Sequence, residues 1–171
     1  MRCMHPAEPA AAPDPMAATD DATATPARLR TLPSRLLGLT AAHADRLVGG
    51  RLAEADARKW HYAVLAALDD GGPASQAEIS RRTGVYRSDL VAVINEMSGR
   101  GLIERAPDPG DRRRNVITLT PAGRERLRHL DALLAQAQEE LLAPLDATER
   151  AQLTALLTKL LVHHGGPRHG A

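Results

Sequence analysis

Three consecutive arginines, Arg112, Arg113 and Arg114, stand between the Pro/Gly-rich stretch 107–110 and the strand-like run 115–120. A guanidinium offers a planar set of five N–H donors that matches phosphate oxygens and the edges of nucleic-acid bases. Side chains alternate in direction along an extended chain, so Arg113 points away from its two neighbours. The run therefore predicts either a phosphate-binding hairpin tip or a solvated cluster of charge at a turn.

A second group of residues able to bind a polyanion lies at the start of a helix predicted over 87–100. In a helix-turn-helix these leading residues face the major groove, where polar side chains bind bases or phosphates and small apolar ones pack on thymine methyl groups. The candidates are Arg87, Ser88, Asp89, Val91, Ala92 and Asn95, joined by Ser75 and Gln76 at the start of the preceding helix. For Asp89, stabilisation by the helix dipole is an alternative to accepting a hydrogen bond from a cytosine amino group.

The elements that would position these residues begin with two short helices around a turn. Ser75 and Glu78 have the S-x-x-E spacing of a capping box, which predicts a helix over 76–82. Gly84 suits the positive φ of a tight turn before the next helix. The apolar residues of that second helix recur every three or four positions and predict its buried face: Leu90, Val93, Ile94 and Met97.

The hydrophobic period then changes from 3.6 to 2, which predicts a β-hairpin of "LIERA" and "NVITLT". Ile117 and Leu119 share one face and Thr118 takes the other. A helix-turn-helix followed by a hairpin is a winged helix-turn-helix, and a wing tip reaches the minor groove beside the same duplex. We therefore expect Arg113 to enter that groove, and its two arginine neighbours to bind phosphates.

Further helices are predicted on both sides of this winged unit. One runs over about 32–48 and is expected to end at Gly49 and Gly50, because each glycine costs about 1 kcal/mol relative to alanine inside a helix. Another covers "ARKWHYAVLAALDD". After the hairpin, Thr120 and Pro121 predict the start of a long helix with a narrow leucine stripe. The last helix follows the capping pair Asp146 and Glu149.

The fold class that these elements predict is mainly α with a small β-hairpin wing, and its flanking helices show more leucine than the central unit could cover. We expect those helices to form a dimer interface. The predicted organisation is a disordered Pro/Ala-rich tail at 1–27, a winged-helix domain at 28–164 and a flexible end at 165–171. Within the domain, the DNA-binding module is 57–123, and the dimerisation helices are 28–56 and 121–164.

The positive charge of the chain is concentrated around the candidate residues. Residues 71–128 contain eleven arginines and seven acidic residues, a net charge of +4 in a chain whose total is +1. Nearly all basic residues are arginines, and the two lysines are Lys59 and Lys159. A base composition that favours arginine codons would also raise this count, so only the position of the arginines indicates nucleic acid.

The sequence lacks the motifs of common enzymes and metal sites. No G-x-S-x-G, phosphate loop or H-E-x-x-H occurs, so we expect no enzymatic activity. His163, His164 and His169 lie near the chain end on different faces and predict no metal cage. The single cysteine, Cys3, excludes an intrachain disulfide and fits a cytoplasmic protein. No apolar run is long enough to span a membrane.

From Ser75 to Gly123 the chain resembles the multiple antibiotic resistance regulator (MarR) family. The likeness is carried by "SQAEISRRTGVYRSDLVAVINEMSGRGLIER" and "DRRRNVITLTPAG". The second stretch fits the wing pattern of that family, D-x-R, five residues, L-T, two residues, G, at Asp111, Arg113, Leu119, Thr120 and Gly123. With the flanking helices the resemblance covers about 28–164, whereas Val91 and Ala92 stand where many relatives carry polar residues.

The resemblance implies a homodimer that reads a pseudo-palindrome in double-stranded DNA, with half-sites about 10 bp apart. It implies that Asp111 orients the wing and that Arg113 enters the minor groove. Repression is the implied mode of regulation. The alternative is a winged helix that binds a protein partner. Affinity for such a partner would respond little to salt, whereas affinity for a duplex contacted through phosphates falls steeply as the salt concentration rises.

The resemblance also implies a small aromatic or phenolic effector, bound between the dimer helices and the winged module, and no other cofactor. The candidates are His43 on an apolar helix stripe and the consecutive Trp60, His61 and Tyr62, in a chain with one further aromatic residue, Tyr86. The alternative is that Trp60 and Tyr62 anchor the core and that His43 is a hydrogen-bonded residue of the dimer interface.

Overall fold

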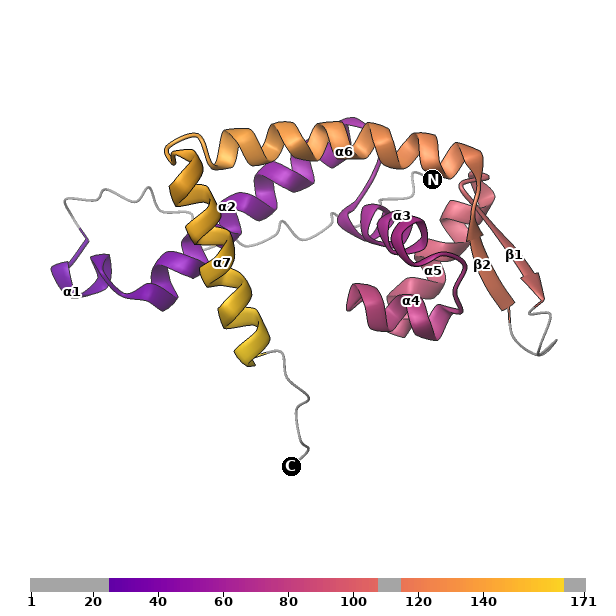
Figure 1. Ribbon diagram of the computed structural model, residues 1–171, viewed down its shortest axis with the longest axis horizontal. Coiled ribbons are helices and arrows are strands. Elements are labelled where there is room, and N and C mark those ends of the chain that lie inside the picture. The colour runs from indigo at the N-terminus through magenta and orange to yellow at the C-terminus, as the bar shows by residue number, and fades with distance from the viewer. Residues whose placement is uncertain (1–24, 108–114, 165–171) are drawn as a thin grey trace, which may run out of the picture. The chain divides into compact units, whose positions relative to one another are not determined.

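The computed structural model describes residues 25–107 and 115–164, which form helices and one two-stranded antiparallel sheet (Figure 1). The predicted fold class, mainly helical with a small hairpin, is confirmed. In chain order the elements are α1 (Ala27–Arg30), α2 (Pro33–Glu54), α3 (Lys59–Gly71), α4 (Gln76–Thr83), α5 (Arg87–Gly99), β1 (Ile103–Pro107), β2 (Asn115–Leu119), α6 (Pro121–Leu141) and α7 (Ala147–His164).

The chain divides into two compact units, Met1–Ala42 and His43–Ala171. In the first unit the described residues comprise α1 and the beginning of α2. Leucine side chains of this unit are more than two-fifths exposed, namely Leu29, Leu32, Leu36 and Leu37. The second unit contains the rest of α2, all later elements and the hydrophobic core.

The predicted end of the first long helix at Gly49 and Gly50 is wrong, because α2 continues through both glycines to Glu54. Two tertiary interactions outweigh the intrinsic cost of glycine. Leu52 is only 1% exposed within the core, and Arg51 Nη2 lies 2.9 Å from a Glu140 carboxylate oxygen on α6. The chain leaves the helical conformation at Asp56, whose φ of +48° is one that aspartate tolerates better than most residues.

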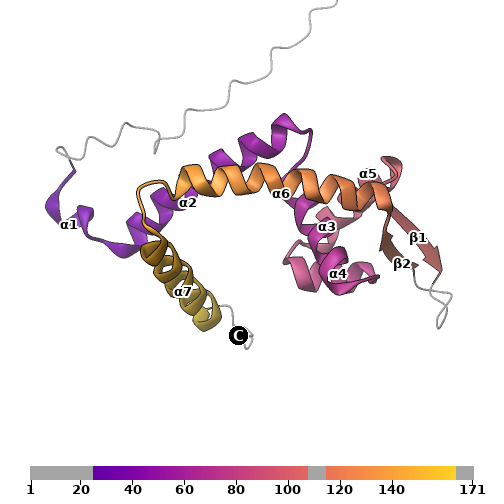
Figure 2. The same cartoon turned by 45° about the horizontal axis from the view of Figure 1, so that its top comes forward.

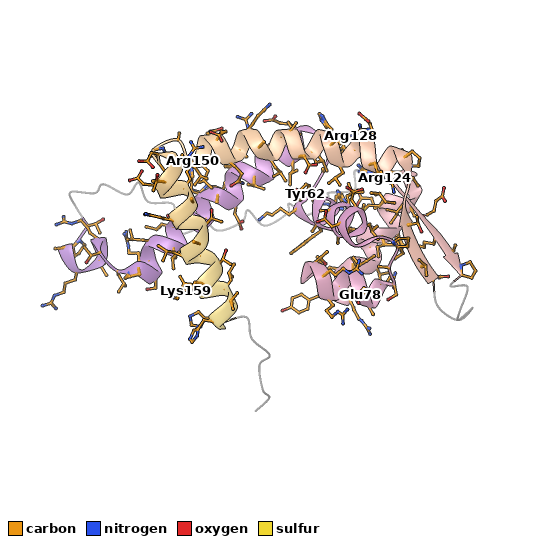
Figure 3. All side chains as sticks on the ribbon, in the orientation of Figure 1. Tyr62, Glu78, Arg124, Arg128, Arg150 and Lys159 are labelled. Carbon is orange, nitrogen blue, oxygen red and sulfur yellow. The ribbon has the colours of Figure 1, made fainter. Side chains whose placement is uncertain are left out.

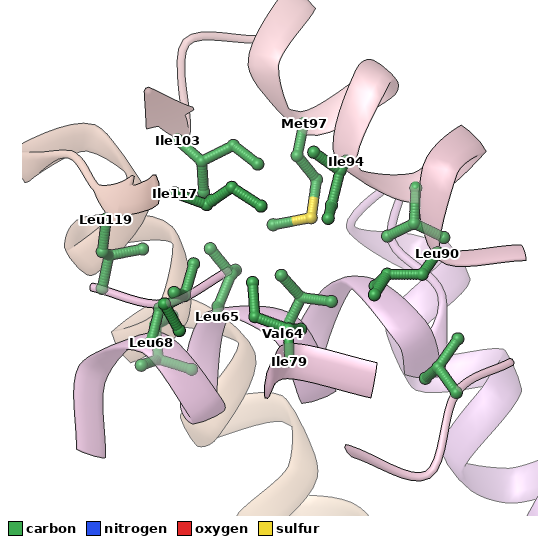
Figure 4. Close-up of a cluster of buried hydrophobic side chains, with 14 of the residues drawn as sticks. Val64, Leu65, Leu68, Ile79, Leu90, Ile94, Met97, Ile103, Ile117 and Leu119 are labelled. Atoms are coloured by element: carbon green, nitrogen blue, oxygen red, sulfur yellow. The ribbon is translucent and has the colours of Figure 1, made fainter. Parts of the chain in front are cut away.

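The hydrophobic core lies in the winged part of the second unit (Figure 4). Each of α3, α4, α5, β1 and β2 contributes at least one side chain that is 1% exposed or less. The predicted inner face of α5 is confirmed, since Leu90, Val93, Ile94 and Met97 are all buried. Because these side chains come from elements on both sides of the turn, the core fixes α5 against α4 and the hairpin.

The turn between α4 and α5 is built as its sequence predicts. Gly84 has φ +71° and ψ 4°, a left-handed conformation that glycine adopts without strain. Ser80 Oγ donates to the Val85 carbonyl oxygen at 2.6 Å, and the Val85 side chain is buried. At the start of α4, Ser75 Oγ accepts from the Glu78 backbone N–H, while the Glu78 carboxylate accepts from Arg82 Nε at 2.8 Å. The left-handed Gly84 and the Ser80–Val85 hydrogen bond shape the turn that leads into α5.

The hairpin pairs Ile103 with Leu119 and Pro107 with Asn115. Its predicted faces are confirmed, because Ile117 and Leu119 are buried and Thr118 is exposed. A feature that the sequence did not predict is an antiparallel bridge between Ala74 and Ile117, with N–H to carbonyl oxygen distances of 3.0 and 2.9 Å. This bridge attaches the residue just before the α4 N-cap to the hairpin, so it fixes the start of α4 relative to the wing.

Thr120 and Gly123 join the hairpin to α6. Thr120 Oγ1 accepts from the Gly123 backbone N–H at 3.0 Å, as the predicted N-cap requires, and donates to the Gly101 carbonyl oxygen at 2.8 Å. A Cβ on Gly123 would lie 2.1 Å from the Leu102 carbonyl oxygen, so only glycine fits this contact without a shift. The capping pair before α7 is also confirmed, with reciprocal 2.9 Å bonds between Asp146 and Glu149.

Several sequence predictions fall on other parts of the chain. Residues 1–24 of the predicted tail, the wing residues Asp111, Arg112, Arg113 and Arg114, and the C-terminal residues 165–171 lie outside the described residues. Among the residues that are described, no helix is both long enough and apolar enough to cross a membrane.

Candidate nucleic-acid interface

A groove of about 560 Å³ lies where α4, α5 and the hairpin meet. Its lining residues are Ser75, Gln76, Ala77, Arg87, Leu90, Val91, Arg105, Asn115 and Ile117. Figures 1 and 2 show the hairpin beside α5 in both views. The start of α5 and the strands of the wing therefore lie on one surface, the arrangement that joint binding of a duplex needs.

Two helix N-termini open into this groove. Ser75, Gln76 and Ala77 are the N-cap and first two residues of α4, and Arg87 is the first residue of α5. Unpaired N–H groups at a helix start carry a partial positive charge that favours anions. Arg87 and Arg105 add two guanidinium groups to the lining. The groove thus combines backbone donors and fixed positive charge, which is the chemistry that binds phosphates.

The candidate residues of α5 lie on its exposed side. Arg87, Ser88, Asp89, Val91, Ala92 and Asn95 are all exposed. Ser88 Oγ donates to Asp89 Oδ1 at 3.3 Å, and Asp89 lies in the first turn, where the helix dipole stabilises a carboxylate. Val91 is 45% exposed and lines the groove, so it offers an apolar surface next to the polar ones.

Sequence reasoning missed Arg105 and Asn115, which line the groove from the two strands of the hairpin. Arg105 Nη2 donates to Asn95 Oδ1 at 2.5 Å, which links the wing strand to the outer face of α5. The signal was present in the strand period, because Arg105 follows Ile103 by two positions and pairs with Ile117, both of them buried. It therefore shares their face of the strand.

The four candidate effector residues differ in exposure and in their partners within the chain. His43 is exposed and Trp60 is 45% exposed, so Trp60 does not anchor the core of this chain. Tyr62 is half-buried, and its hydroxyl donates to Asp131 Oδ1 on α6 at 3.0 Å. Burial, and to a lesser extent this hydrogen bond, raises the pKa of Tyr62. Figure 3 labels Tyr62 on α3. None of the four lines the groove described above.

His61, the remaining candidate, is 5% exposed and faces α5. The Arg58 backbone N–H donates to His61 Nδ1 at 3.2 Å, and His61 Nε2 lies 3.2 Å from Glu96 Oε2. Burial lowers the pKa of His61 below its usual 6.5, and this effect exceeds the opposing effect of Glu96. His61 is therefore a neutral residue with both ring nitrogens occupied inside the chain.

Glu96 is a third residue that sequence reasoning missed. Its carboxylate binds Arg58 and lies 2.8 Å from Arg100 Nη2, while Arg100 Nη1 lies 2.9 Å from Asp56 Oδ2. Burial alone would raise the pKa of Glu96, but His61 and the two guanidinium groups outweigh it, so that pKa is lowered. Within residues 25–107 and 115–164, no group of three or more His, Cys, Asp or Glu side chains could hold a metal ion.

Comparison with known proteins places this geometry among transcription regulators. Residues 56–114 match the MarR family. The chain is 34% identical over 100 residues to the HTH-type transcriptional repressor NicR of Pseudomonas putida, an alignment that covers 58% of this chain and 63% of NicR. The chain therefore spans less than two thirds of the length of that relative.

Two solved structures share the fold. A mutant of MarR from E. coli, complexed with operator DNA, is 26% identical with a TM-score of 0.68 and covers 80% of this chain and 99% of that one. PcaV from Streptomyces coelicolor, in complex with its natural ligand, is 29% identical with a TM-score of 0.68 and covers 80% and 96%. Together with the match over residues 56–114, these likenesses make the MarR family the group of proteins that this chain resembles.

Proposed function

We propose that this protein is a sequence-specific, double-stranded DNA-binding transcriptional regulator that acts as a repressor. The observation that carries the proposal is the single groove formed by the N-termini of α4 and α5 and by both hairpin strands. A partial positive charge at two helix starts and two arginines suit a phosphate backbone. NicR is named as a repressor, and the MarR structure holds operator DNA, which supports the same role here.

In this proposal the exposed face of α5 enters the major groove of the duplex. Arg87, Ser88 and Asn95 hydrogen-bond to bases or phosphates, and Val91 and Ala92 contact thymine methyl groups. Asp89 either accepts from a cytosine amino group or stabilises the helix start. Ser75 and Gln76 bind phosphate at the start of α4, and Arg105 and Asn115 join this set from the wing strands.

The wing tip completes the interface in the minor groove. Arg113 inserts, Arg112 and Arg114 bind flanking phosphates, and Asp111 holds the tip in place. This assignment is supported by Asn115, the first residue after this segment, which lines the same groove as Arg87. The module at 57–123 would then carry all the DNA contacts.

We further propose that the protein acts as a homodimer through 28–56 and 121–164. Exposed leucines support this assignment, because α7 buries none of its side chains within one chain. A two-fold dimer would place two modules on half-sites about 34 Å apart. DNA binding and the family match fit a cytoplasmic location.

A small aromatic or phenolic effector is the regulator that we propose. PcaV is described in complex with its natural ligand, which supports a ligand for this chain as well. Trp60 is the most suitable of the candidates for contact with such a ligand, because its ring is 45% exposed. His43 is also exposed, whereas His61 and Tyr62 already have partners within the chain. Quenching of Trp60 fluorescence by a panel of aromatic carboxylates tests this assignment.

The test of DNA binding starts with affinity selection of fragments from the source genome, which identifies the operator and its half-site spacing. Arg113→Ala should then weaken operator binding by about 1–3 kcal/mol in a gel-shift titration. The matched control is Arg128→Ala on α6, labelled in Figure 3, which removes an exposed arginine that does not line the groove. Equal affinity of Arg113→Ala and the parent protein would remove the wing from the mechanism.

Salt separates this function from the alternative, a winged helix that binds a protein partner. A protein that makes six to ten phosphate contacts loses about 1,000-fold or more in affinity for a duplex between 50 and 200 mM salt. A partner held by the apolar part of α5 would respond far less. Selection that returns no preferred duplex, even at 50 mM salt, would favour the protein partner.

A further inference from the structure

The C-terminal part of α5 is held by a cluster of charged and polar side chains, none of which lines the groove. Glu96, from the last turn of α5, accepts from Arg58 and Arg100 and lies 3.2 Å from His61 Nε2. Arg100 also donates to the Asp56 carbonyl oxygen at 3.0 Å. The cluster therefore ties α5 to the segment that connects α2 with α3.

His61 is the buried centre of this cluster, and its two ring nitrogens have different roles. Nδ1 accepts the Arg58 backbone N–H at the start of α3, so the ring proton of the neutral imidazole is on Nε2. Nε2–H then donates to the Glu96 carboxylate. One neutral ring thus caps α3 and holds α5 at the same time.

We propose that the His61–Glu96 bridge positions α5 for operator recognition and that His61 must be neutral for its ring to hold α3 and α5 together. The proposal rests on the DNA-binding function proposed above and assigns His61 a positioning role in place of effector binding. Candidate base-contacting residues and Glu96 belong to one helix, so a tilt of α5 would displace all of them together. Contacts to bases depend on the exact orientation of α5, whereas contacts to the phosphate backbone tolerate a tilt of the helix better.

Protonation would break the contact of the ring with α3 at a defined atom, Nδ1, whereas Nε2–H would still donate to Glu96. A proton on Nδ1 would face the Arg58 N–H, which already points at that nitrogen, and two donors cannot share the contact. The charged groups that face the ring are Glu96 and Arg100 from α5 and Arg58 from the connecting segment, with Asp56 behind Arg100. Two of the three nearest charges are positive. Burial also lowers the pKa of His61, so the folded arrangement favours the neutral ring.

The first arm of the test measures α5 directly, without DNA. Amide hydrogen exchange of peptides from α5 and α3 is compared at pH 7.5 in the parent protein, His61→Ala and His61→Gln. We expect exchange in α5 to rise about tenfold in His61→Ala. His61→Gln should restore most of the protection, because its amide can still donate to Glu96. Unchanged α5 exchange in His61→Ala would overturn the positioning role, whatever the protein binds.

The second arm measures affinity for the selected operator and for a scrambled duplex between pH 7.5 and 5.5. The ratio of the two affinities should fall at least fivefold as pH drops below 6.5 in the parent protein and stay constant in His61→Gln. His129→Gln, which replaces an exposed histidine of α6, should keep the fall. The same fall in His61→Gln would overturn the requirement for neutral His61. If no duplex is preferred at any pH, the proposed function fails, and the exchange data still decide whether His61 positions α5.

Discussion

The winged module and α7 differ in how fully they bury their apolar side chains. The module closes its core within one chain, and Val64, Ile79, Ile94 and Ile117 are 0% exposed. In α7, by contrast, no residue is buried, and Leu161 is 72% exposed. The module can therefore fold around its own side chains, whereas α7 leaves a leucine-rich surface that a second chain would cover.

The largest effect should come from placing charge on this leucine-rich surface. Leu157 and Leu161 are one helical turn apart, so Leu157→Glu combined with Leu161→Glu alters one face of α7. Each change occurs twice in a symmetric dimer. The dimer should weaken by at least about 3 kcal/mol, roughly a 150-fold rise in Kd, in sedimentation equilibrium. The winged module should keep its fold, because neither leucine belongs to its core.

The control for this pair is Gln152→Glu, which adds negative charge at an exposed polar position of the same helix. It should leave the dimer unchanged. If the double variant sedimented as the parent protein does, the exposed leucines of α7 would not form the dimer interface, and the contrast between the two regions would need another explanation.

The second-largest effect is expected at Gly123, where the chain is tightly packed. In Gly123→Ala the new methyl group would lie 2.1 Å from the Leu102 carbonyl oxygen and 2.6 Å from Leu119 Cδ1. The junction between the hairpin and α6 must shift to accommodate it. Overpacking of this kind lowers the free energy of unfolding by about 2 kcal/mol, measurable by urea denaturation. A loss below about 0.5 kcal/mol would show that this junction is not rigid.

The same contrast explains what could be predicted from sequence. Caps and turns depend on residues close in the chain, so Gly84, the Thr120 N-cap and the Asp146–Glu149 pair were predicted correctly. The end of α2 was not, because Leu52 is buried in the tertiary core and Arg51 pairs with Glu140, 89 positions away. The unfavourable helix propensity of Gly49 and Gly50 can be read from the local sequence, but the distant contacts that outweigh it cannot.

The candidate interface divides in the same way. The exposed face of α5 follows from helical period alone, so its candidates could be chosen from sequence. The Ala74–Ile117 bridge joins residues 43 positions apart and has no local pattern. His61 was considered for effector binding because aromatic residues are scarce, yet its partner Glu96 lies 35 positions away. Only the packing of α3 on α5 reveals that pair.

A smaller effect is expected at Arg105, which lies on the exposed surface of the winged module and not in its core. Arg105→Ala removes a groove residue and its bond to Asn95 Oδ1 without opening the core. Operator affinity should fall by about 1 kcal/mol, while the free energy of unfolding should change by less than about 0.5 kcal/mol. Gel-shift and urea titrations of the same preparation measure both. With Arg128→Ala as the control, an equal loss in both variants would mean that overall charge, rather than the groove, sets the affinity.

The smallest effect compares one glycine with another. Gly50 lies inside α2, and among the described residues a Cβ there would meet no atom within 4 Å beyond its chain neighbours and the nearby backbone of its own helix. Because alanine restricts the unfolded chain and favours the helix, Gly50→Ala should raise the free energy of unfolding by about 0.5–1 kcal/mol, the opposite sign to Gly123→Ala. Urea denaturation at several protein concentrations measures this change. A loss of stability in the dimer would contradict it and would mean that a second chain packs against Gly50, which would extend the intermolecular surface from α7 to α2.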